Sequence, residues 1–526
     1  MTFTRYELTI PVELTSELHI GGVDPVPDRD GEGTVIRFNR NGLKEPTIPG
    51  RSIRGAVRAG CNVLWEERKL KDDPSGVFSE TNWKSLWGDD LAHHEGDSPD
   101  DVLPVRRSAL TFHAVSFPQY KDIDSGESPL PRRHGVGIDR TTGAASDGAL
   151  YEHEFLPRGT KFDIRITAEG RDGEQKEDDD KEPQNDKQSD GIPGPAPSKS
   201  VKKLLEVIVD VLTSGAVCLG GRTGSGQGTI QVIEPKLRRT GKTTDAGALT
   251  APADVLDALI GEDEEGTPIP LELGGWSLEE PARIRINWWS PTGIFVAEDE
   301  KLTKQRKEEA RKKDPTANGV TEPLRDPSVP WDEAQLLIPG TSIRGALRSR
   351  ASRIARTVLA AKDKLPTFTS HDLHEQIAAE PNLVRYMFGC AKYRGAVTVH
   401  DCRSKKCDTH VEVTHNAIDR WTGGVIDGGL FTEAVYLGTE WEKIQIEIDL
   451  RRLLKNIEAE KGPADKRKAT DADKAEKKTE AKHEPADADE AEDGSDKSKQ
   501  PKPTHADYAH ASYVLLGLAL AELSAG

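Results

Sequence analysis

The chain of 526 residues is poor in aromatic residues, at 5%, and only 35% of it is hydrophobic. No stretch of about 18 apolar residues is present, which excludes an ordinary transmembrane helix. The N-terminus lacks a basic patch followed by an apolar core and a cleavage site, and Met1 to Ile10 instead alternates like a strand. The five cysteines are scattered and odd in number, which argues against a disulfide framework. We therefore expect a cytoplasmic protein with no membrane segment.

Positive charge is also in deficit, since the net charge is −18. Much of the negative charge lies in two tracts of Lys, Glu, Asp, Pro and Ala, from Glu169 to Asp190 and from Glu458 to Lys502. Because they hold almost no hydrophobic residues, we expect both tracts to be disordered. Because the net charge includes these solvated tracts, it does not exclude a basic surface that binds nucleic acid. The positions of the arginines in the sequence are a better guide to such a surface.

Two sequence patterns occur twice and in the same order. Ile48 to Ala59 reads IPGRSIRGAVRA, and Ile338 to Ser349 reads IPGTSIRGALRS. Ile138-Asp139-Arg140, followed by Asp147-Gly148, has its counterpart in Ile418-Asp419-Arg420, followed by Asp427-Gly428. The spacing far exceeds the period of a solenoid, so the chain contains two copies of one domain.

Each copy predicts strands interleaved with single helices, an α+β fold of the ferredoxin-like or RNA-recognition-like type. We predict a first domain over 1–237 with a disordered insertion at about 169–200. A linker over 238–275 and a second domain over 276–526, with an insertion at about 456–505, complete the chain. The first copy ends in a glycine-rich loop and a strand, and the second reaches Gly526 without either. We expect that the native chain is longer or that a partner completes the second domain.

The IPG motif predicts a helix with a phosphate-binding N-terminus. Ser52 is a plausible N-cap, and Arg54 and Arg58 are four residues apart on one helix face. Free N–H groups and the positive end of the helix dipole bind phosphate. The second copy repeats the pattern with Ser342, Arg344 and Arg348. An amphipathic helix with solvated arginines is the alternative.

A glycine-rich loop, Gly220 to Gly228, follows a predicted helix and precedes a strand. A dinucleotide-binding fingerprint requires the opposite order, and no Gly-Lys-Ser/Thr is present for a nucleoside-triphosphate loop. We predict contact with a sugar–phosphate backbone through Gly221, Arg222, Gly224 and Gly226. A flexible hairpin turn is the alternative.

Together these motifs resemble those of the RAMP (repeat-associated mysterious protein) superfamily, and within it the fused backbone subunits of type III CRISPR effectors. The resemblance implies tandem RAMP domains that bind guide RNA and a single-stranded target RNA and assemble with other effector subunits. It also implies thumb hairpins that begin at Ile138-Asp139-Arg140 and Ile418-Asp419-Arg420 and displace a nucleotide. A structural hairpin with a local Asp139–Arg140 ion pair is the alternative.

The resemblance further implies metal-dependent cleavage of the paired target RNA by a loop aspartate between Gly21-Gly22 and the IPG motif. That interval holds the candidate catalytic residues Asp28, Asp30 and Glu32, with Asp30 as the metal ligand, and the ion would be Mg²⁺ or Mn²⁺. In the second copy only Glu322 lies near the corresponding place, which puts cleavage by that domain in doubt. An ordinary turn is the alternative for such a loop.

Three functions stay open at this point: a backbone subunit that cleaves target RNA, a scaffold that only binds RNA, and a guide-processing endoribonuclease. The last requires a histidine acid–base site, for which His19 is the only hint. Cys390, Cys402, Cys407 and His410 could hold zinc but lack two close Cys-x-x-Cys pairs.

Overall fold

A computed structural model describes most of the chain, with gaps. The described residues are 2–22, 26–27, 34–67, 69–70, 72, 77–88, 107–122, 128–140, 142–172, 196–244, 266–298, 308, 311–312, 319–329, 335–362, 372–406, 409–460 and 503–525. They form two compact units. Unit 1 comprises Met1–Gly135, Tyr151–Glu280 and Asp326–Ala334, and unit 2 comprises Val136–Leu150, Pro281–Arg325 and Gln335–Gly526.

Unit 1 is built on an antiparallel sheet with the strand order β12-β11-β1-β9-β5, in which β10 also pairs with β1. Alternation along β9 points Phe162, Ile164 and Ile166 into the core and leaves the residues between them outside. The bounds are β1 (Thr2–Leu14), β5 (Leu110–Phe112), β9 (Lys161–Asp172), β10 (Ile230–Val232), β11 (Lys236–Thr244) and β12 (Thr267–Ile269).

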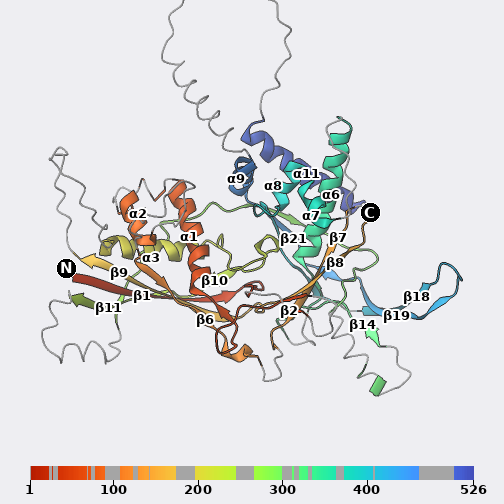
Figure 1. The fold of residues 1–526 in the computed structure, drawn as a ribbon, viewed down its shortest axis with the longest axis horizontal. Coiled ribbons are helices and arrows are strands. Elements are labelled where there is room, and N and C mark those ends of the chain that lie inside the picture. The colour runs from red at the N-terminus through yellow and green to blue at the C-terminus, as the bar shows by residue number, and fades with distance from the viewer. Residues whose placement is uncertain are drawn as a thin grey trace, which may run out of the picture. The chain divides into compact units, whose positions relative to one another are not determined.

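Three helices cover one face of this sheet: α1 (Gly50–Glu66), α2 (Glu80–Trp87) and α3 (Ser198–Thr213) (Figure 1). The apolar stripe of α1, Ile53, Val57, Cys61 and Leu64, joins the side chains of β1 and β9 in one hydrophobic core. The mixed α+β class predicted from the sequence is therefore correct.

The predicted linker is wrong in part. Leu237, Arg238 and Arg239 belong to β11, which pairs with β1 and with β12. Leu271, Trp276 and Leu278 then pack on the core of unit 1. Leu237 is buried but stands among charged and polar neighbours, so the sequence did not reveal that this segment is a strand with a core position. Glu169 to Asp172, predicted to be disordered, likewise pair with β1, while 173–195 and 461–502 lie outside the described residues.

A smaller sheet in the first copy has the order β2-β3-β8-β7. Its members are β2 (Val26–Pro27), β3 (Thr34–Ile36), β7 (Arg132–Ile138) and β8 (Ala145–Glu154), and β3 runs parallel to β8. A further pair joins β4 (Thr47–Ile48) to β6 (Val115–Ser116), next to the short helix η1 (Pro118–Tyr120).

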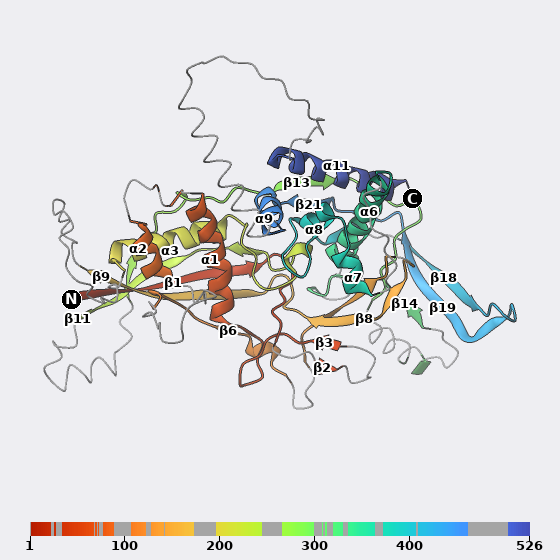
Figure 2. The ribbon, with the colours of Figure 1, turned by 45° about the horizontal axis from the view of Figure 1, so that its top comes forward.

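Unit 2 repeats these elements around the sheet β13-β21-β16. The strands are β13 (Ala282–Ile286), β16 (Val397–Val399) and β21 (Ile444–Ile448). Packed around its core are α6 (Gly340–Ala360), α8 (Asn382–Phe388), α9 (Leu450–Glu460) and α11 (His505–Ser524) (Figure 2). A shorter helix, α7 (Leu373–Ala378), precedes α8.

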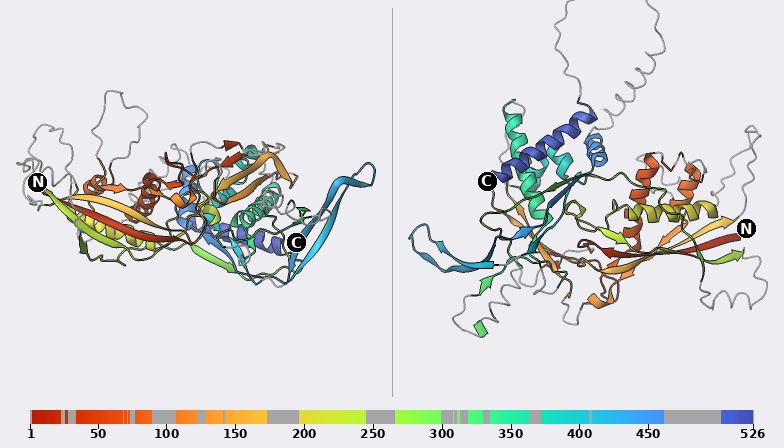
Figure 3. Two further views of the ribbon diagram at one scale, coloured as in Figure 1. Left: turned by 90° about the horizontal axis from the view of Figure 1, so that it is seen from below. Right: turned by 180° about the vertical axis from the view of Figure 1, so that it is seen from behind.

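The duplication extends to the pairing of the short strands. β15 (Leu337–Ile338) pairs with β17 (Cys402–Lys406), as β4 pairs with β6, and β17 also pairs with β20 (Glu440–Trp441). β14 (Val320–Thr321) runs parallel to β19 (Val425–Leu437), as β3 does to β8. β19 also pairs with β18 (Thr409–Ile418), and this hairpin projects from the rest of unit 2 (Figure 3).

The motif helices begin earlier than predicted. α1 begins at Gly50 with Pro49 as its N-cap, and the Ser52 amide donates to the Pro49 carbonyl, so Ser52 is inside the helix and is not the cap. α6 begins in the same way at Gly340, and its first amide donates to the carboxylate of Asp401 at 2.7 Å. A Cβ at Gly50 would overlap the carbonyl of Phe112, so the tertiary fit of this turn requires glycine.

Candidate functional site

The arginine of the Ile-Arg-Gly sequence in each IPG motif contacts the C-terminus of another helix in its own domain. Arg54 donates to the carbonyl of Trp87 at the end of α2. Arg344 donates from Nη2 to the carbonyl of Phe388 at the end of α8, at 2.6 Å, and lies over the Phe388 ring. A cation at a helix C-terminus satisfies free carbonyls and complements the dipole. Burial, with Arg348 nearby, lowers the pKa of Arg344 to about 10. Both arginines thus contact main-chain carbonyls of their own domain, and phosphate binding by them stays a prediction.

Arg348 also faces inward, toward the buried carboxylate of Glu380. Its Nε and Nη2 lie 2.9 and 2.6 Å from Glu380 Oε2, and Nη2 donates to the Gly389 carbonyl at 2.9 Å. Glu380 is 3% exposed, so this is a buried ion pair. Arg58, its counterpart in α1, is half-buried. Ser342 is exposed and its amide donates to Pro339, which leaves its hydroxyl on the surface.

The tips of the two predicted thumb hairpins have the same internal geometry. The amide of Asp139 donates to Ala144, and the amide of Gly143 donates back to Asp139, both at 2.9 Å. Asp419, Gly424 and Gly423 repeat the two bonds at 2.9 and 2.8 Å. In each tip the aspartate side chain accepts an amide within the turn, from Thr142 or from Trp421.

The tip from the first copy packs within unit 2, against α7. Gln376 holds it in two ways: Nε2 donates to Asp139 Oδ1 and Oε1 accepts the Arg140 amide, both at 2.8 Å. Arg140 Nε also lies 3.7 Å from Glu380, the carboxylate that binds Arg348. Asp139 and Gln376 are both buried, whereas Ile138 is partly exposed. No sequence signal pointed to Gln376, because its role arises from packing between residues 237 positions apart.

The second tip is exposed. Trp421 has 97% of its surface exposed and Ile418 60%, and Arg420 beside them is also exposed. In a chain of few aromatics, a tryptophan between Arg420 and Thr422-Gly423 at a turn is a signal for a binding role that motif matching alone missed.

The glycine-rich loop is a compact turn around η2 (Thr223–Ser225). Gly221 is exposed and its amide donates to the carbonyl of His19 at 2.8 Å, whereas Gly226 is buried and adopts a positive φ. Gly224 is half-buried. Arg222 Nη1 donates to Tyr151 at 3.1 Å and its guanidinium lies 4.6 Å from the centre of the Tyr151 ring. The predicted loop thus presents Arg222, positioned by an aromatic side chain that the motif did not reveal.

His19 lies under this loop and is buried. Its Nδ1 is 2.6 Å from the carbonyl of Glu154, and its ring packs edge-on against His153. Burial lowers the pKa of His19, and burial together with the charge of Arg222 lowers the pKa of His153 to about 2. Burial thus disfavours the protonated form of both imidazoles, which is the form that a general acid requires.

The predicted cleavage residues Asp28, Asp30 and Glu32 lie outside the described residues, as does Asp24. The described residues on either side of these candidates are held by main-chain pairing. The amide of Gly22 donates to Arg37, and Pro27 pairs with Thr34. Arg37 then contacts Asp122 at 3.0 Å and the buried Glu154 at 3.4 Å, and Arg40 joins the same two carboxylates at 2.9 Å each.

Strand register corrects the predicted counterpart in the second copy. Val35 pairs with Glu152 on β8, and Val320 pairs with Thr432 on β19, the residue that corresponds to Glu152 in the repeat. Glu322 therefore follows β14 and corresponds to Arg37, whereas the first copy's carboxylates precede β3. Glu322 contacts Arg325 at 3.9 Å.

Cys407 of the possible zinc set also lies outside the described residues. Cys402 is buried in a small core and its thiol lies 3.3 Å from the carbonyl of Glu442, Cys390 is half-buried, and His410 is exposed on β18. Within the described ranges, no three His, Cys, Asp or Glu side chains are arranged to hold a metal ion.

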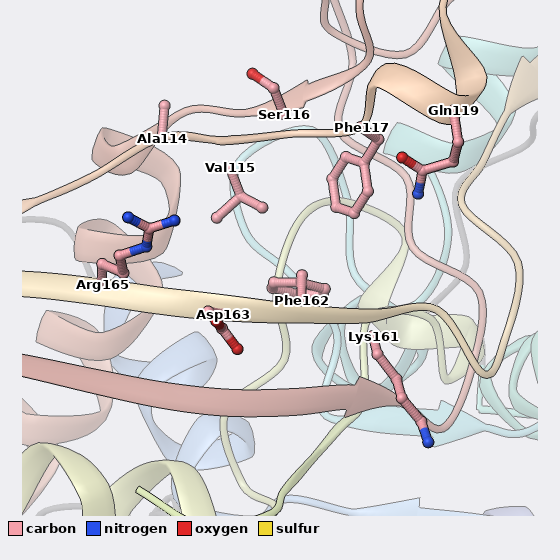
Figure 4. A pocket seen from close by; sticks show the side chains of 9 residues that line it. All are labelled: Ala114, Val115, Ser116, Phe117, Gln119, Lys161, Phe162, Asp163 and Arg165. Atoms are coloured by element: carbon pink, nitrogen blue, oxygen red, sulfur yellow. The ribbon is translucent and has the colours of Figure 1, made fainter. Parts of the chain in front are cut away.

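An open pocket in unit 1 lies between the β6–η1 segment and the start of β9 (Figure 4). Phe117 and Phe162 line it, with their ring centres 5.7 Å apart and the rings edge-on. Lys161, Asp163 and Arg165 line it from β9. None of the motif residues contributes to it.

Comparison with known families agrees with the duplicated architecture. The sequence matches the RAMP superfamily over residues 12–231 and again over 336–461. These matches cover both motif helices, both hairpin tips and the glycine-rich loop. No curated protein matches the chain. Within the part of the chain that the structure describes, no helix is both long and apolar enough to cross a membrane. The chain is a member of the RAMP superfamily with two RAMP regions in tandem, and it has the CRISPR-associated, RNA-binding character of that superfamily.

Proposed function

We propose that this protein is a guide-RNA-binding backbone subunit of a type III CRISPR effector. The observation that carries the proposal is the exposed tip of the β18–β19 hairpin, with Ile418, Trp421 and Arg420 on its surface. An apolar and an aromatic side chain can enter a base stack and unstack it, and an adjacent arginine can neutralise the backbone phosphate. The two tips share one geometry, but the first is packed on α7, so the second is the stronger candidate for nucleotide displacement.

Arg222 supplies the second RNA contact in this proposal. The Gly221 and Arg222 surface lies at a turn where small residues permit close approach of a sugar–phosphate backbone. Tyr151 holds the guanidinium in place through the 3.1 Å hydrogen bond and the ring contact. The inward-facing Arg54, Arg344 and Arg348 act in this reading mainly by shaping the scaffold, and Ser342 remains on the surface.

Substitution of Trp421 tests this function. Loss of one base–aromatic stack costs about 1–3 kcal/mol, so Trp421→Ala should weaken binding of guide RNA by about 5- to 150-fold. Trp289→Ala is the matched control, because Trp289 is also strongly exposed, at 76%, and lies away from the tip in the sequence. Fluorescence anisotropy with labelled guide RNA at several salt concentrations gives both affinities. Equal affinity for the two variants would refute a role of the second tip in RNA binding.

We further propose that the first domain cleaves guide-paired target RNA, with Asp28, Asp30 and Glu32 as the candidate carboxylates and Asp30 as a metal ligand. A bound Mg²⁺ or Mn²⁺ would stabilise negative charge that develops on the reacting phosphate. Two observations support this proposal. The interval between Gly22 and the IPG motif resembles the cleavage loop of the type III backbone subunits, and Arg37 and Arg40, which follow the candidate carboxylates, are held by ion pairs with Asp122 and Glu154.

The cleavage experiment separates catalysis from binding. Asp28→Ala, Asp30→Ala and Glu32→Ala combined should abolish a single cut per subunit, leave target binding intact and reproduce the effect of EDTA. Glu322→Ala is the control, because strand register removes Glu322 from the equivalent place. Two strong cuts that survive the triple substitution would place the chemistry elsewhere, and binding without any cut would identify a non-catalytic scaffold.

A further inference from the structure

The last helix of unit 2 is less completely covered than its counterpart in unit 1. α3 is buried on every side from Val207 to Leu212. In α11 the buried residues Ser512, Leu515, Leu516 and Ala519 have the same spacing as Val201, Leu204, Leu205 and Ile208 of α3. The two helices therefore direct the same face to their cores. The opposite face differs: Leu518 of α11, which takes the place of the buried Val207, is 50% exposed, and Val514 is 46% exposed.

In unit 1 the covering is done by segments that follow α3. Val217 and Leu219, at the start of the glycine-rich loop, and Leu278 are buried in the core with α3. Asp210 of α3 accepts the amides of Gly274 and Gly275, at 2.8 and 3.1 Å. These bonds bind an extended segment to the outer side of the helix. No segment in the described part of unit 2 holds α11 in this manner.

The sheets differ at the same side. β1 pairs with β9 along one edge and with β10 and β11 along the other. Among the described strands, β13 pairs only with β21. Ile284 and Ile286 of β13 pair with Ile446 and Ile444, as Leu8 and Ile10 of β1 pair with Ile166 and Ile164.

Burial follows this difference in pairing. Leu8 and Ile10 are fully buried, but Ile284 and Ile286 are only partly so. They contact the same hydrophobic cluster as Leu520 and Leu523 of α11, which are also partly buried. In unit 1 one segment of the chain, which follows α3, covers both corresponding places: it packs on the helix and pairs with the edge of β1.

We infer that β13 and α11 form a docking surface for a strand of another polypeptide. Unit 1 defines the chemistry of the occupant: apolar residues that lie on the helix, a glycine-rich turn, and a short strand of alternating apolar residues that pairs antiparallel with the edge. Strand addition supplies main-chain hydrogen bonds, and alternate side chains supply specificity. A second copy of this chain is not the occupant, because its own β10 and β11 are already paired with β1. We assign the surface to a different chain that carries a segment of this chemistry.

A peptide from the chain itself can stand in for the partner. Residues Ala216 to Thr244 contain the covering residues, the glycine-rich turn, β10 and β11, and β11 includes Leu237, which pairs with Leu8 of β1. A synthetic copy should bind the full-length protein with one-to-one stoichiometry in calorimetry. A copy carrying Ile230→Asp should bind at least tenfold more weakly, because Ile230 is buried in unit 1. On the protein, Leu518→Asp should weaken peptide binding at least tenfold. Val358→Asp is the control, since Val358 is 51% exposed on α6 and should leave binding unchanged.

The outcomes are distinct. Peptide binding that is lost with Leu518→Asp and kept with Val358→Asp supports the surface. No binding at millimolar peptide, or binding that Leu518→Asp leaves unchanged, overturns it. Concentration-dependent dimers in light scattering that Leu518→Asp abolishes would make a second copy the occupant and overturn the assignment to a different chain. All measurements omit RNA, so they do not depend on the proposed RNA-binding function.

Discussion

Replacement of Arg348 by Ala should destabilise unit 2, which is the sharpest test of where the motif arginines point. The change leaves the carboxylate of Glu380 buried, with Arg140 Nε 3.7 Å away as its remaining cation. Removal of one member of a buried ion pair costs about 3–5 kcal/mol, and because Arg140 still contacts Glu380 we expect the lower end of that range. Arg350→Ala removes the same charge from the same helix and should cost under about 1 kcal/mol.

The assay is denaturant unfolding of the full-length chain combined with hydrogen exchange of the amides in α7 and α8. Exchange should accelerate there with Arg348→Ala and not with Arg350→Ala. Replacing both partners, Arg348→Met with Glu380→Leu, should recover most of the loss, because no buried charge is then left without its partner. If Arg348→Ala is as stable as Arg350→Ala but binds RNA less well, the guanidinium is a phosphate ligand and the structural interpretation is refuted.

The remaining predictions concern single residues in both units. In the folded protein the pKa of His153 is about 2, against an ordinary value of 6.5, so below pH 6.5 the unfolded chain binds a proton that the folded protein does not. Above pH 6.5 the burial of neutral His153 therefore leaves the free energy of unfolding independent of pH. Below pH 6.5 this residue should lower the free energy of unfolding by about 1.4 kcal/mol per pH unit as the pH drops toward 2. His153→Gln should flatten the pH dependence of unfolding measured from pH 7 to 5, and His113→Gln, at an exposed position, should not. An equal slope in both variants would contradict the burial argument. Gly228→Ala should destabilise the glycine-rich loop by several kcal/mol, because φ is +81° and the added Cβ would overlap the Leu219 carbonyl. Gly517→Ala, with no atom within 4 Å of the added Cβ in α11, should stabilise the helix by up to about 1 kcal/mol, and a thermal melt of each variant should give melting temperatures that move in opposite directions.

The duplication, the mixed α+β class and the positions of the motif helices could be derived from the sequence alone. They depend on local patterns: alternating residues for the strands around Ile164 and Ile446, a stripe from Ile53 to Leu64 for α1, and two motifs repeated in order. Such patterns arise from burial of one face of an element, which neighbouring residues in the sequence record directly.

Only the tertiary structure decided what the motif residues contact. Arg54 and Arg344 turn toward carbonyls 33 and 44 residues away, and Asp139 reaches Gln376 across 237 positions. The strand register that aligns Glu322 with Arg37, and the inclusion of Leu237 in the first sheet, likewise come from pairing between distant segments. Spacing along a helix predicts which side chains share a face, but whether that face meets solvent, a carboxylate or a backbone carbonyl depends on which distant segment packs against it.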